Sequence, residues 1–376
     1  MACFLILASQ IFTRGEDVKK LFCFLTILFV TTNSFSNINT FKVMHYNILA
    51  KHLGNNFEPW FMYSDLMEGD EYLDKCDLVK EIMYCQDCNG GYLYPSLRKI
   101  VDRLKLGSNG EYQEDTCQNP YRDLFDCKYL QSLMHYQNEY FSWKKRLPKI
   151  LTRIDSENPD ILSLVELDAV HEIGSSLQEK GYQFVYAKRP KSADGIGIFF
   201  KRSLFSSEGH DIIHFKSGKE NHNRIALLVR LKHQSSDAHI LFVSTHLMRE
   251  PEDLQKEGLR VQESIQLLNK ITSIADKMTE PYHVIITGDL NADQNSRTLE
   301  VFRSNGYKTA TQKNADLITS VTCQRKMKLD YILFNSEDYF LEVTNLSELM
   351  NVPNEGPIPN KTHGSDHLPL VANFKY

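Results

Sequence analysis

The feature that most constrains this chain is an apolar strand that ends abruptly in acid. Residues 284–287 (VIIT) have the apolar, β-branched composition of a buried strand. The run stops at Gly288 and is followed at once by Asp289, Asn291 and Asp293. A buried strand gains nothing from carboxylate and amide groups at its end unless they bind something there. The segment therefore indicates a site for a ligand that takes oxygen donors.

Several other segments with strand character also carry polar side chains at one end. Each of these residues, taken alone, is most often a turn former, a helix cap or a satisfied imidazole. Together they form a set that needs one explanation. The set is Asn47 in VMHYNILA, Glu166 in DILSLVELD, His246 in STHLM, Asp330 in LDYI, and Asp366 and His367 in GSDHLP.

The residue types in this set favour a hard metal ion and phosphoryl transfer. Carboxylate and amide oxygens suit Mg²⁺, with Mn²⁺ as an alternative, and a zinc site is less natural because no cysteine takes part. A metal polarises the phosphate, a carboxylate activates water, and histidines stabilise the developing charge. Gly288 would let a phosphate approach the backbone closely.

The order of the expected elements favours an α/β fold. Helices and strands alternate only in part and several strands pair locally, so the sheets should be mixed rather than purely parallel. No linker or internal repeat divides residues 37–376, which we interpret as a single domain. One expected helix, within residues 141–160, has an apolar face made of Trp143, Leu147, Ile150, Leu151 and Ile154.

The motifs, taken in order, resemble the endonuclease/exonuclease/phosphatase superfamily. The resemblance covers almost all of residues 41–50 and 140–376, and it rests on YNILA, DILSLVELD, DGIGIFFK, NRIALLVRL, STHLMREPED, ITGDLNAD, LDYILFN and SDHLPLVANF. Within the superfamily, HYNILA, FSWKKR and GDLNADQNSRTLEVFRSNGY are most similar to the nocturnin and deadenylase branch. The resemblance implies a four-layer α/β sandwich of two packed mixed β-sheets flanked by helices, with the active site at one edge of the sheets.

The resemblance also implies which residues hold the metal. Glu166 is expected to be the principal Mg²⁺ ligand, with Asn47 beside it and Asp366 at the metal's edge. The family normally has a glutamine immediately before this glutamate, where this chain has Val165. That departure leaves the local orientation of Glu166 open.

The remaining residues of the set are expected, by the same resemblance, to act on the phosphate and the attacking water. Asp289 should orient or deprotonate the water, while Asn291 and His246 should contact the scissile phosphate. Asp330 should hold His367 in a carboxylate–imidazole pair that fixes its tautomer and favours its protonated form.

Further residues are candidates for binding the substrate. Asn223, in NRIALL, matches a family asparagine near the phosphate. Lys188, Arg189, Lys191 and Arg249 are basic residues close to the motifs, and they would suit the phosphates of a polymer. Solvated surface charge explains these basic residues equally well.

The N-terminal segment predicts a secretory signal peptide over residues 1–36. Two lysines precede an apolar run that is too short to span a bilayer comfortably, and residues 34–36 (SFS) have the small-x-small form that precedes cleavage. We expect a mature chain that starts at Asn37 and is secreted or enters the secretory pathway. The alternatives are a membrane anchor and a mitochondrial transit peptide, and Glu16 and Asp17 count against the second.

The cysteines are consistent with a secretory route. Two of the eight cysteines fall in the predicted leader, and five of the remaining six cluster in an irregular insertion at about residues 55–140. Cys85 and Cys88 lack a second close Cys/His pair, so disulfide bonds are favoured over zinc, with their pairing open. Two sequons, at Asn345 and Asn360, predict glycosylation. The insertion either caps the cleft or is a surface elaboration.

The charge of the chain limits its substrates. The formal net charge is −5, and a chain starting at Asn37 would carry one positive charge less. That balance argues against an extended electrostatic grip on nucleic acid, but not against a short substrate whose phosphate is held by a metal.

We therefore predict an enzyme, an Mg²⁺-dependent phosphodiesterase or nuclease that hydrolyses phosphodiester or phosphate ester bonds of RNA or nucleotides with metal-activated water. One alternative is a phospholipid phosphodiesterase of the neutral sphingomyelinase type, for which the aromatic residues 55–63 would contact the lipid. The other is a non-catalytic binding protein built on the same fold. No stable protein partner is implied.

Overall fold

The structure is a computed structural model that describes residues 40–52, 140–218, 220–278, 280, 282–310, 317–321, 326–335 and 358–375. The predicted leader, nearly all of the cysteine-rich insertion, all eight cysteines and the sequon at Asn345 lie outside these residues. No helix in the described ranges is long and apolar enough to cross a membrane.

Five strands form the first sheet, in the order β13-β1-β2-β4-β3. Strands β1 and β2 run parallel, and the other neighbours run antiparallel, so this sheet is mixed as predicted. The strands are β1 (Thr40–Asn47), β2 (Ile161–Leu167), β3 (Tyr182–Lys188), β4 (Gly195–Lys201) and β13 (Leu370–Lys375).

Six strands form the second sheet, in the order β5-β6-β7-β8-β12-β9. Strands β7 and β8 are its parallel pair, and the other neighbours are antiparallel. The strands are β5 (Phe205–Ser217), β6 (Glu220–His233), β7 (His239–His246), β8 (Tyr282–Asp289), β9 (Tyr307–Thr309) and β12 (Asp330–Asn335). A separate short ribbon pairs β10 (Ser320–Val321) with β11 (Lys326–Met327).

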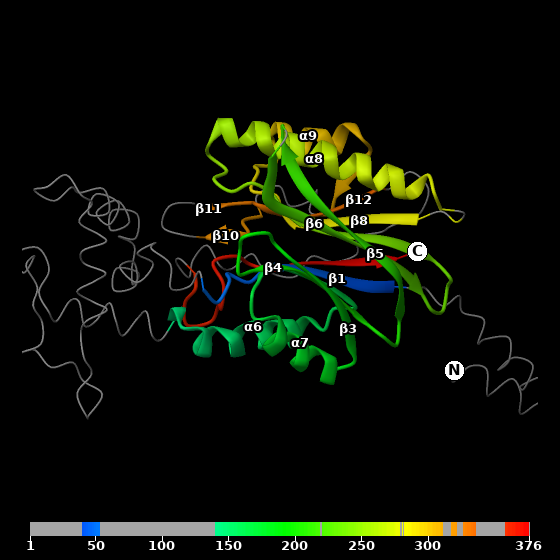
Figure 1. Cartoon of the computed structure of the whole chain (residues 1–376). Helices are drawn as coiled ribbons and strands as arrows, with labels where there is room; N and C mark the ends of the chain where they lie inside the picture. The colour runs from blue at the N-terminus through cyan, green and yellow to red at the C-terminus, as the bar shows by residue number, and fades with distance from the viewer. Residues whose placement is uncertain are drawn as a thin grey trace, which may run out of the picture.

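Helices cover the outer face of each sheet. Helices α6 (Trp143–Glu157) and α7 (Val170–Glu179) lie along the first sheet, and α8 (Leu254–Ala275) and α9 (Arg297–Ser304) lie along the second (Figure 1). The result is helix, sheet, sheet, helix, which confirms the predicted four-layer α/β sandwich.

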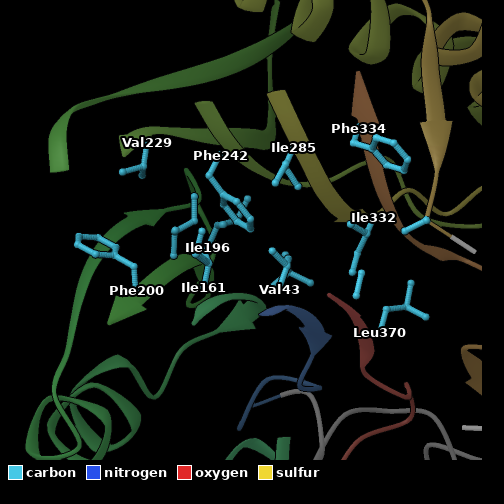
Figure 2. Packing of buried hydrophobic residues seen from close by; sticks show 14 of the residues in the cluster. Val43, Ile161, Ile196, Phe200, Val229, Phe242, Ile285, Ile332, Phe334 and Leu370 are labelled. Carbon is cyan, nitrogen blue, oxygen red and sulfur yellow. The ribbon is translucent and has the colours of Figure 1, made fainter. Parts of the chain in front are cut away.

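The main core lies between the two sheets (Figure 2). Alternation along β1 explains how a single strand serves two layers, because successive side chains point to opposite faces. Val43 packs into the core between the sheets, whereas Met44 packs with Ile150 and Ile154 of α6 on the outer face. Each such aliphatic side chain contributes roughly 1.5–3 kcal/mol when it leaves water. Ile285 of β8 points inward from the opposite sheet in the same way.

The predicted apolar face of α6 is correct at Trp143, Ile150 and Ile154, which are buried, but it misses a residue that the structure buries completely. Arg146 has no exposed surface. Its guanidinium donates hydrogen bonds to five backbone carbonyl oxygens, at Phe141 (3.0 Å), Ile48 (3.0 Å), Leu49 (2.7 Å), Ala50 (3.2 Å) and Gly364 (3.1 Å).

Two segments that flank the candidate site are therefore tied to one side chain. The carbonyls of residues 48–50 follow β1 directly, and Gly364 precedes the pair Asp366 and His367. Backbone carbonyls that are buried without a donor destabilise a fold, so Arg146 satisfies groups that the loops themselves leave open.

Candidate active site

The predicted polar residues lie at one edge of the two packed sheets. Within the second sheet, Asp289 at the end of β8 pairs with His246 on one side and with Asp330 on the other. Within the first sheet, Asn47 ends β1, and its Nδ2 lies 3.0 Å from Asp289 Oδ2 across the sandwich. Residues far apart in the chain thus meet where the strands of both sheets end.

Glu166 owes its direction to a bulge in β2. The register between β2 and β4 shifts between Val165 and Leu167, and Glu166 has a φ of 57°. A positive φ in a residue other than glycine is strained by about 1–2 kcal/mol, and such strain concentrates at functional sites. The Glu166 carboxylate accepts hydrogen bonds from Asn47 Nδ2 at 3.3 Å and from the Ala50 amide at 3.2 Å.

The bulge also explains how Glu166 is oriented although Val165 stands where the family normally has a glutamine. Val165 is fully buried in the core between the sheets and does not contribute a polar neighbour to Glu166. The orientation of the glutamate is set by the bulge, by Asn47 and by the backbone amide of Ala50.

Asn47 links the carboxylates of the two sheets. Its Nδ2 faces both Glu166 Oε1 and Asp289 Oδ2, and its Oδ1 accepts a hydrogen bond from the Leu49 amide at 3.1 Å. In this arrangement the amide positions the two carboxylates. Ligation of a metal through the Asn47 oxygen would require the amide to turn over.

His367 and Asp330 form the predicted carboxylate–imidazole pair. His367 Nδ1 lies 2.6 Å from Asp330 Oδ2, and both side chains are buried. Burial alone would lower the pKa of His367, but the charges of Asp330, Asp366 and Asp289 raise it to about 10. Burial likewise acts to raise the pKa of Asp330, and the charge of His367 together with its hydrogen bonds holds it well below its usual range.

A second histidine, His45, was not predicted from the sequence. Its Nε2 lies 3.0 Å from Asp330 Oδ1, and its Nδ1 lies 3.1 Å from Ser163 Oγ, which is 2.6 Å from Ser244 Oγ. His45 stands two residues before Asn47 in β1, and this spacing places the two side chains on the same face of the strand. That spacing is the signal that would have pointed to His45.

His246 stands between the two carboxylates without bonding tightly to either. Its Nε2 is 3.6 Å from Asp289 Oδ2, and its Nδ1 is 3.9 Å from Glu166 Oε1. Nδ1 is buried and has no hydrogen-bond partner among the described residues. Burial, reinforced by the charges of Arg224 and Arg189, lowers the pKa of His246 well below its usual value. A neutral imidazole results, which can donate a hydrogen bond from one ring nitrogen.

Asp289 is the residue on which the contacts converge. Its Oδ1 accepts a hydrogen bond from the Asn291 amide at 3.0 Å, while its Oδ2 faces Asn47, His246 and His367, the last at 3.8 Å. Burial raises the pKa of Asp289, partly offset by the charge of His367. Asn291 has a φ of 47°, and its Nδ2 lies 3.4 Å from the Leu247 carbonyl oxygen.

The donor set fits a hard divalent cation. Burial, followed by the charges of Asp366 and Asp194, raises the pKa of Glu166 to about 7, and Asp289 is a second buried carboxylate whose pKa is raised. A cation beside these carboxylates would offset that penalty. A second metal-ligand group also exists, because Asp289, Asp330 and His367 each offer one atom within 4.8 Å of the others. Asp330 already accepts from two histidines, so Glu166 fits the cation better than this group does.

The other predicted residues are distributed unevenly around this edge. Asp366 is buried beside His367. Asn223 is exposed, and the Arg249 side chain is 72% exposed and lies 3.4 Å from Glu250. Gly288 serves a purpose that the sequence did not indicate. An added Cβ there would lie 2.5 Å from the Thr245 carbonyl oxygen, so the close approach is that of β7 rather than of a ligand.

A two-sheet α/β sandwich with buried carboxylates and histidines at one edge has the layout of a phosphate ester hydrolase. The model of the Endonuclease/Exonuclease/phosphatase family matches residues 137–367, which is more than half of the chain, and the chain belongs to this family.

Individual relatives place the chain more closely. It is 26% identical over 265 residues to Nocturnin of Rattus norvegicus, covering 63% of this chain and 60% of the relative. It is 23% identical over 300 residues to the CCR4-Not complex 3'-5'-exoribonuclease subunit Ccr4 of Kluyveromyces lactis, covering 62% of this chain and 38% of the relative. The chain thus spans 60% or less of the length of these two relatives, and the predicted resemblance to the nocturnin and deadenylase branch is confirmed.

A solved structure with the same fold is the human Nocturnin catalytic domain with bound sulfate anion. It superimposes with a TM-score of 0.58 at 19% identity, covering 89% of this chain and 93% of that one. At this identity the likeness establishes the fold.

Proposed function

We propose that the protein is an Mg²⁺-dependent phosphodiesterase or nuclease that hydrolyses phosphodiester or phosphate ester bonds of RNA or nucleotides with water. The observation that carries the proposal is the convergence on Asp289 of an amide, Asn47, and two histidines, His246 and His367, within 3.8 Å of a single carboxylate oxygen. Fold support alone would not produce this cluster of buried titratable groups.

Asp289 is the group suited to orient the attacking water and take its proton. Its Oδ1 accepts a hydrogen bond from the Asn291 amide, which fixes the direction in which Oδ2 faces Asn47, His246 and His367. Burial raises the pKa of Asp289, which brings its basicity closer to that of water-activating carboxylates.

The histidines are suited to the phosphate in two different protonation states. His367 is cationic because Asp330 pairs with it, so it can neutralise charge that develops on a phosphate oxygen. His246 is neutral and lacks a partner at Nδ1, so it can donate a hydrogen bond without adding charge. Asn291 supplies a further amide donor at the same edge.

Glu166, with Asn47 and Asp366 close to it, would hold the cation. When bound there, Mg²⁺ would supply a positive charge that polarises the phosphate and stabilises the leaving oxygen.

Two observations support RNA or a nucleotide as the substrate. Ccr4 is named as a 3'-5'-exoribonuclease subunit, and the chain shares its family and branch. The net charge of −5 disfavours a long electrostatic contact, so recognition should be concentrated around the scissile phosphate.

A substrate panel on the full chain tests the proposal, with Mg²⁺ in one arm and a chelator in the other. The panel contains poly(A) RNA, single-stranded DNA, dinucleotides, NADP-like nucleotides and sphingomyelin. Mg²⁺-dependent cleavage of RNA or nucleotides that disappears in Glu166→Gln, but persists in the surface variant Arg303→Gln, supports it. Cleavage of sphingomyelin alone, or a folded protein that is silent on the whole panel, contradicts it.

A further inference from the structure

Two buried arginines lie at the same edge of the sandwich, on the side away from His367. Arg189 directly follows β3 and Arg224 lies in β6, and they are 8% and 5% exposed. Strands β3 and β6 contact each other across the sandwich. Strands β2 and β7 also contact each other, and β7 is the neighbour of β8, which ends in Asp289. The edge therefore changes in character along its length, from carboxylates and histidines to arginines.

Arg189 is held in place by its own carboxylate. Its Nη2 lies 2.6 Å from Asp194 Oδ1 and 3.2 Å from Ser192 Oγ, and Asp194 has no exposed surface. Asp194 precedes β4 directly, and β4 pairs with the end of β2 through Gly195 and Leu167. Ser192 and Asp194 thus hold the guanidinium of Arg189 in one position, on the side of the site where Glu166 lies.

Among the residues that the structure describes, no carboxylate is hydrogen-bonded to Nε or Nη1 of Arg224. Its Nε and Nη1 are buried, and no described residue accepts a hydrogen bond from either atom. The pairing of Ala226 with Thr245 places Arg224 beside the end of β7, next to His246. The charges of both arginines contribute to the lowered pKa of His246.

A buried guanidinium without a partner is costly to desolvate, and a fold that keeps one normally pairs it. Burial and the neighbouring charge of Arg189 lower the pKa of Arg224 to about 10, so Arg224 remains a cation at neutral pH. Glu263 contributes an opposite charge nearby, and its Oε2 accepts from the Met248 amide at 2.8 Å, but Nε and Nη1 of Arg224 make no hydrogen bond to it. No described residue therefore supplies the missing partner of Arg224, and the anionic groups of a substrate are suited to supply it.

We propose that Arg224, with Arg189 beside it, binds a second, non-scissile phosphate group of the substrate. Guanidinium groups recognise phosphate oxygens through charge-assisted, often bidentate hydrogen bonds, and the free N–H groups of Arg224 are of that kind. The inference rests on the proposed function and deepens it, because it requires a substrate with two phosphates. The second phosphate is either that of a nucleoside bisphosphate or the next one along an RNA strand.

Phosphate binding can be measured without catalysis. The full chain is titrated with inorganic phosphate at constant ionic strength in the presence of a chelator, and thermal stabilisation is followed. Saturable stabilisation is expected in the wild type, in Glu166→Gln and in the surface control Arg303→Gln. In Arg224→Gln we expect at least about tenfold weaker affinity, and in Arg224→Lys an intermediate value.

The binding outcomes separate this inference from the proposed function. Phosphate binding that persists in Glu166→Gln, whatever the activity of the enzyme, supports the anion subsite. Equal affinity in Arg224→Gln and the wild type overturns it, and so does an adventitious ion only, recognised as weak, unsaturable binding in all variants. A structural role for Arg224 predicts a lower melting temperature for ligand-free Arg224→Gln, whereas the anion subsite predicts no decrease, because Nε and Nη1 lose no hydrogen bond to a described residue.

Kinetics identify the source of the second phosphate. Bis(p-nitrophenyl) phosphate carries one phosphate, whereas adenosine 3′,5′-bisphosphate and the dinucleotide pApA carry two. Arg224→Gln should raise KM at least about tenfold more for a two-phosphate substrate than for the one-phosphate ester, with a smaller change in kcat. A selective loss on the bisphosphate assigns the subsite to a nucleotide, and a selective loss on pApA assigns it to a strand. A uniform loss on all three substrates overturns the inference.

Discussion

His367 and Asp330 form a buried ion pair, with 2.6 Å between Nδ1 and Oδ2, and the same carboxylate accepts His45 at 3.0 Å. One acidic side chain of the second sheet therefore fixes two imidazoles that come from elements of the first sheet and its preceding loop. The pair links the two sheets, and in the proposed function it also holds the imidazolium that faces the phosphate.

Asp330→Asn should lower activity and stability together. The loss of the partner of His367 should reduce kcat by about 10²–10⁴, because the imidazolium and its tautomer are no longer held. Removing one member of a buried pair should lower the free energy of unfolding by about 3–5 kcal/mol near pH 6, as measured by urea denaturation.

The pH dependence of that loss has a defined sign. The pKa of folded His367 is raised from 6.5 to about 10, so its stabilisation is complete below pH 6.5 and lost as the pH rises toward about 10. The stability difference between the wild type and Asp330→Asn should therefore shrink over that range. A difference that does not change between pH 6 and 10 would contradict the assignment of the raised pKa to this pair.

Glu166→Gln should abolish Mg²⁺-dependent turnover and weaken Mg²⁺ binding, measured by calorimetry, while leaving the fold intact. Without metal, the pKa of Glu166 is raised from 4.5 to about 7, so the wild type loses stability as the pH rises between these values. In chelator at pH 8 the variant should therefore be the more stable protein, by about 1–3 kcal/mol. Full activity in Glu166→Gln would disprove its role.

Arg146→Met should destabilise the protein more than any surface arginine substitution. It would leave several buried carbonyls without a donor, including those of residues 48–50, at a cost of at least about 3 kcal/mol in urea denaturation. Arg153→Ala on the same helix removes only a partly exposed pair with Glu157 and should change stability by less than about 1 kcal/mol. Similar effects of the two substitutions would argue against the anchoring role of Arg146.

Gly288→Ala should separate β7 from β8. The new methyl group would meet the Thr245 carbonyl oxygen at 2.5 Å, and this atom belongs to the backbone of the neighbouring strand, which leaves little room to relax. Because Asp289 and His246 pair across these strands, we expect lower kcat as well as a lower melting temperature. An added Cβ at Gly258 on α8 meets no neighbouring atom within 4 Å, so Gly258→Ala is the matched control; it should leave kcat near that of the wild type and the melting temperature equal or slightly higher, because alanine favours a helix interior.

The predicted secretory route can be tested on the cysteines. We expect full-length protein expressed in a secretory host to appear in the medium with its N-terminus at Asn37. Denatured but unreduced, it should release no titratable thiol, because six cysteines follow the predicted leader. Free thiols on intracellular protein, with the leader retained, would favour the alternative of a membrane anchor or another compartment.

The sequence was informative wherever a chemical group follows an apolar run. Asn47, Glu166 and Asp289 could be identified because each interrupts or ends a strand whose apolar pattern is clear, and His367 because it precedes one; the structure brings all four together. The mixed sheets were also predictable, since partial alternation of helices and strands excludes a purely parallel fold, whereas the four layers were implied by the resemblance to the family.

The parts that escaped prediction depend on tertiary contacts. Arg146 occupies a position in an amphipathic helix where an arginine is ordinarily solvated, and only the carbonyls of distant loops explain its burial. Arg224 sits within an apolar strand next to Asn223, and the sequence does not reveal which of the two side chains is buried. Gly288 was expected to admit a phosphate, because a sequence does not specify how closely a neighbouring strand approaches.

The bulge at Glu166 separates two demands that a single strand would otherwise have to share. Side chains alternate between the two faces of a regular strand. If the carboxylate faced the site from such a strand, the face of every neighbouring residue would be fixed as well. Here the residue with the positive φ is surplus to the β2–β4 pairing, so Val165 and Leu167 can pack on their respective sides without regard to it. Core substitutions at Val165 and Leu167 therefore need not change the direction in which the Glu166 carboxylate points.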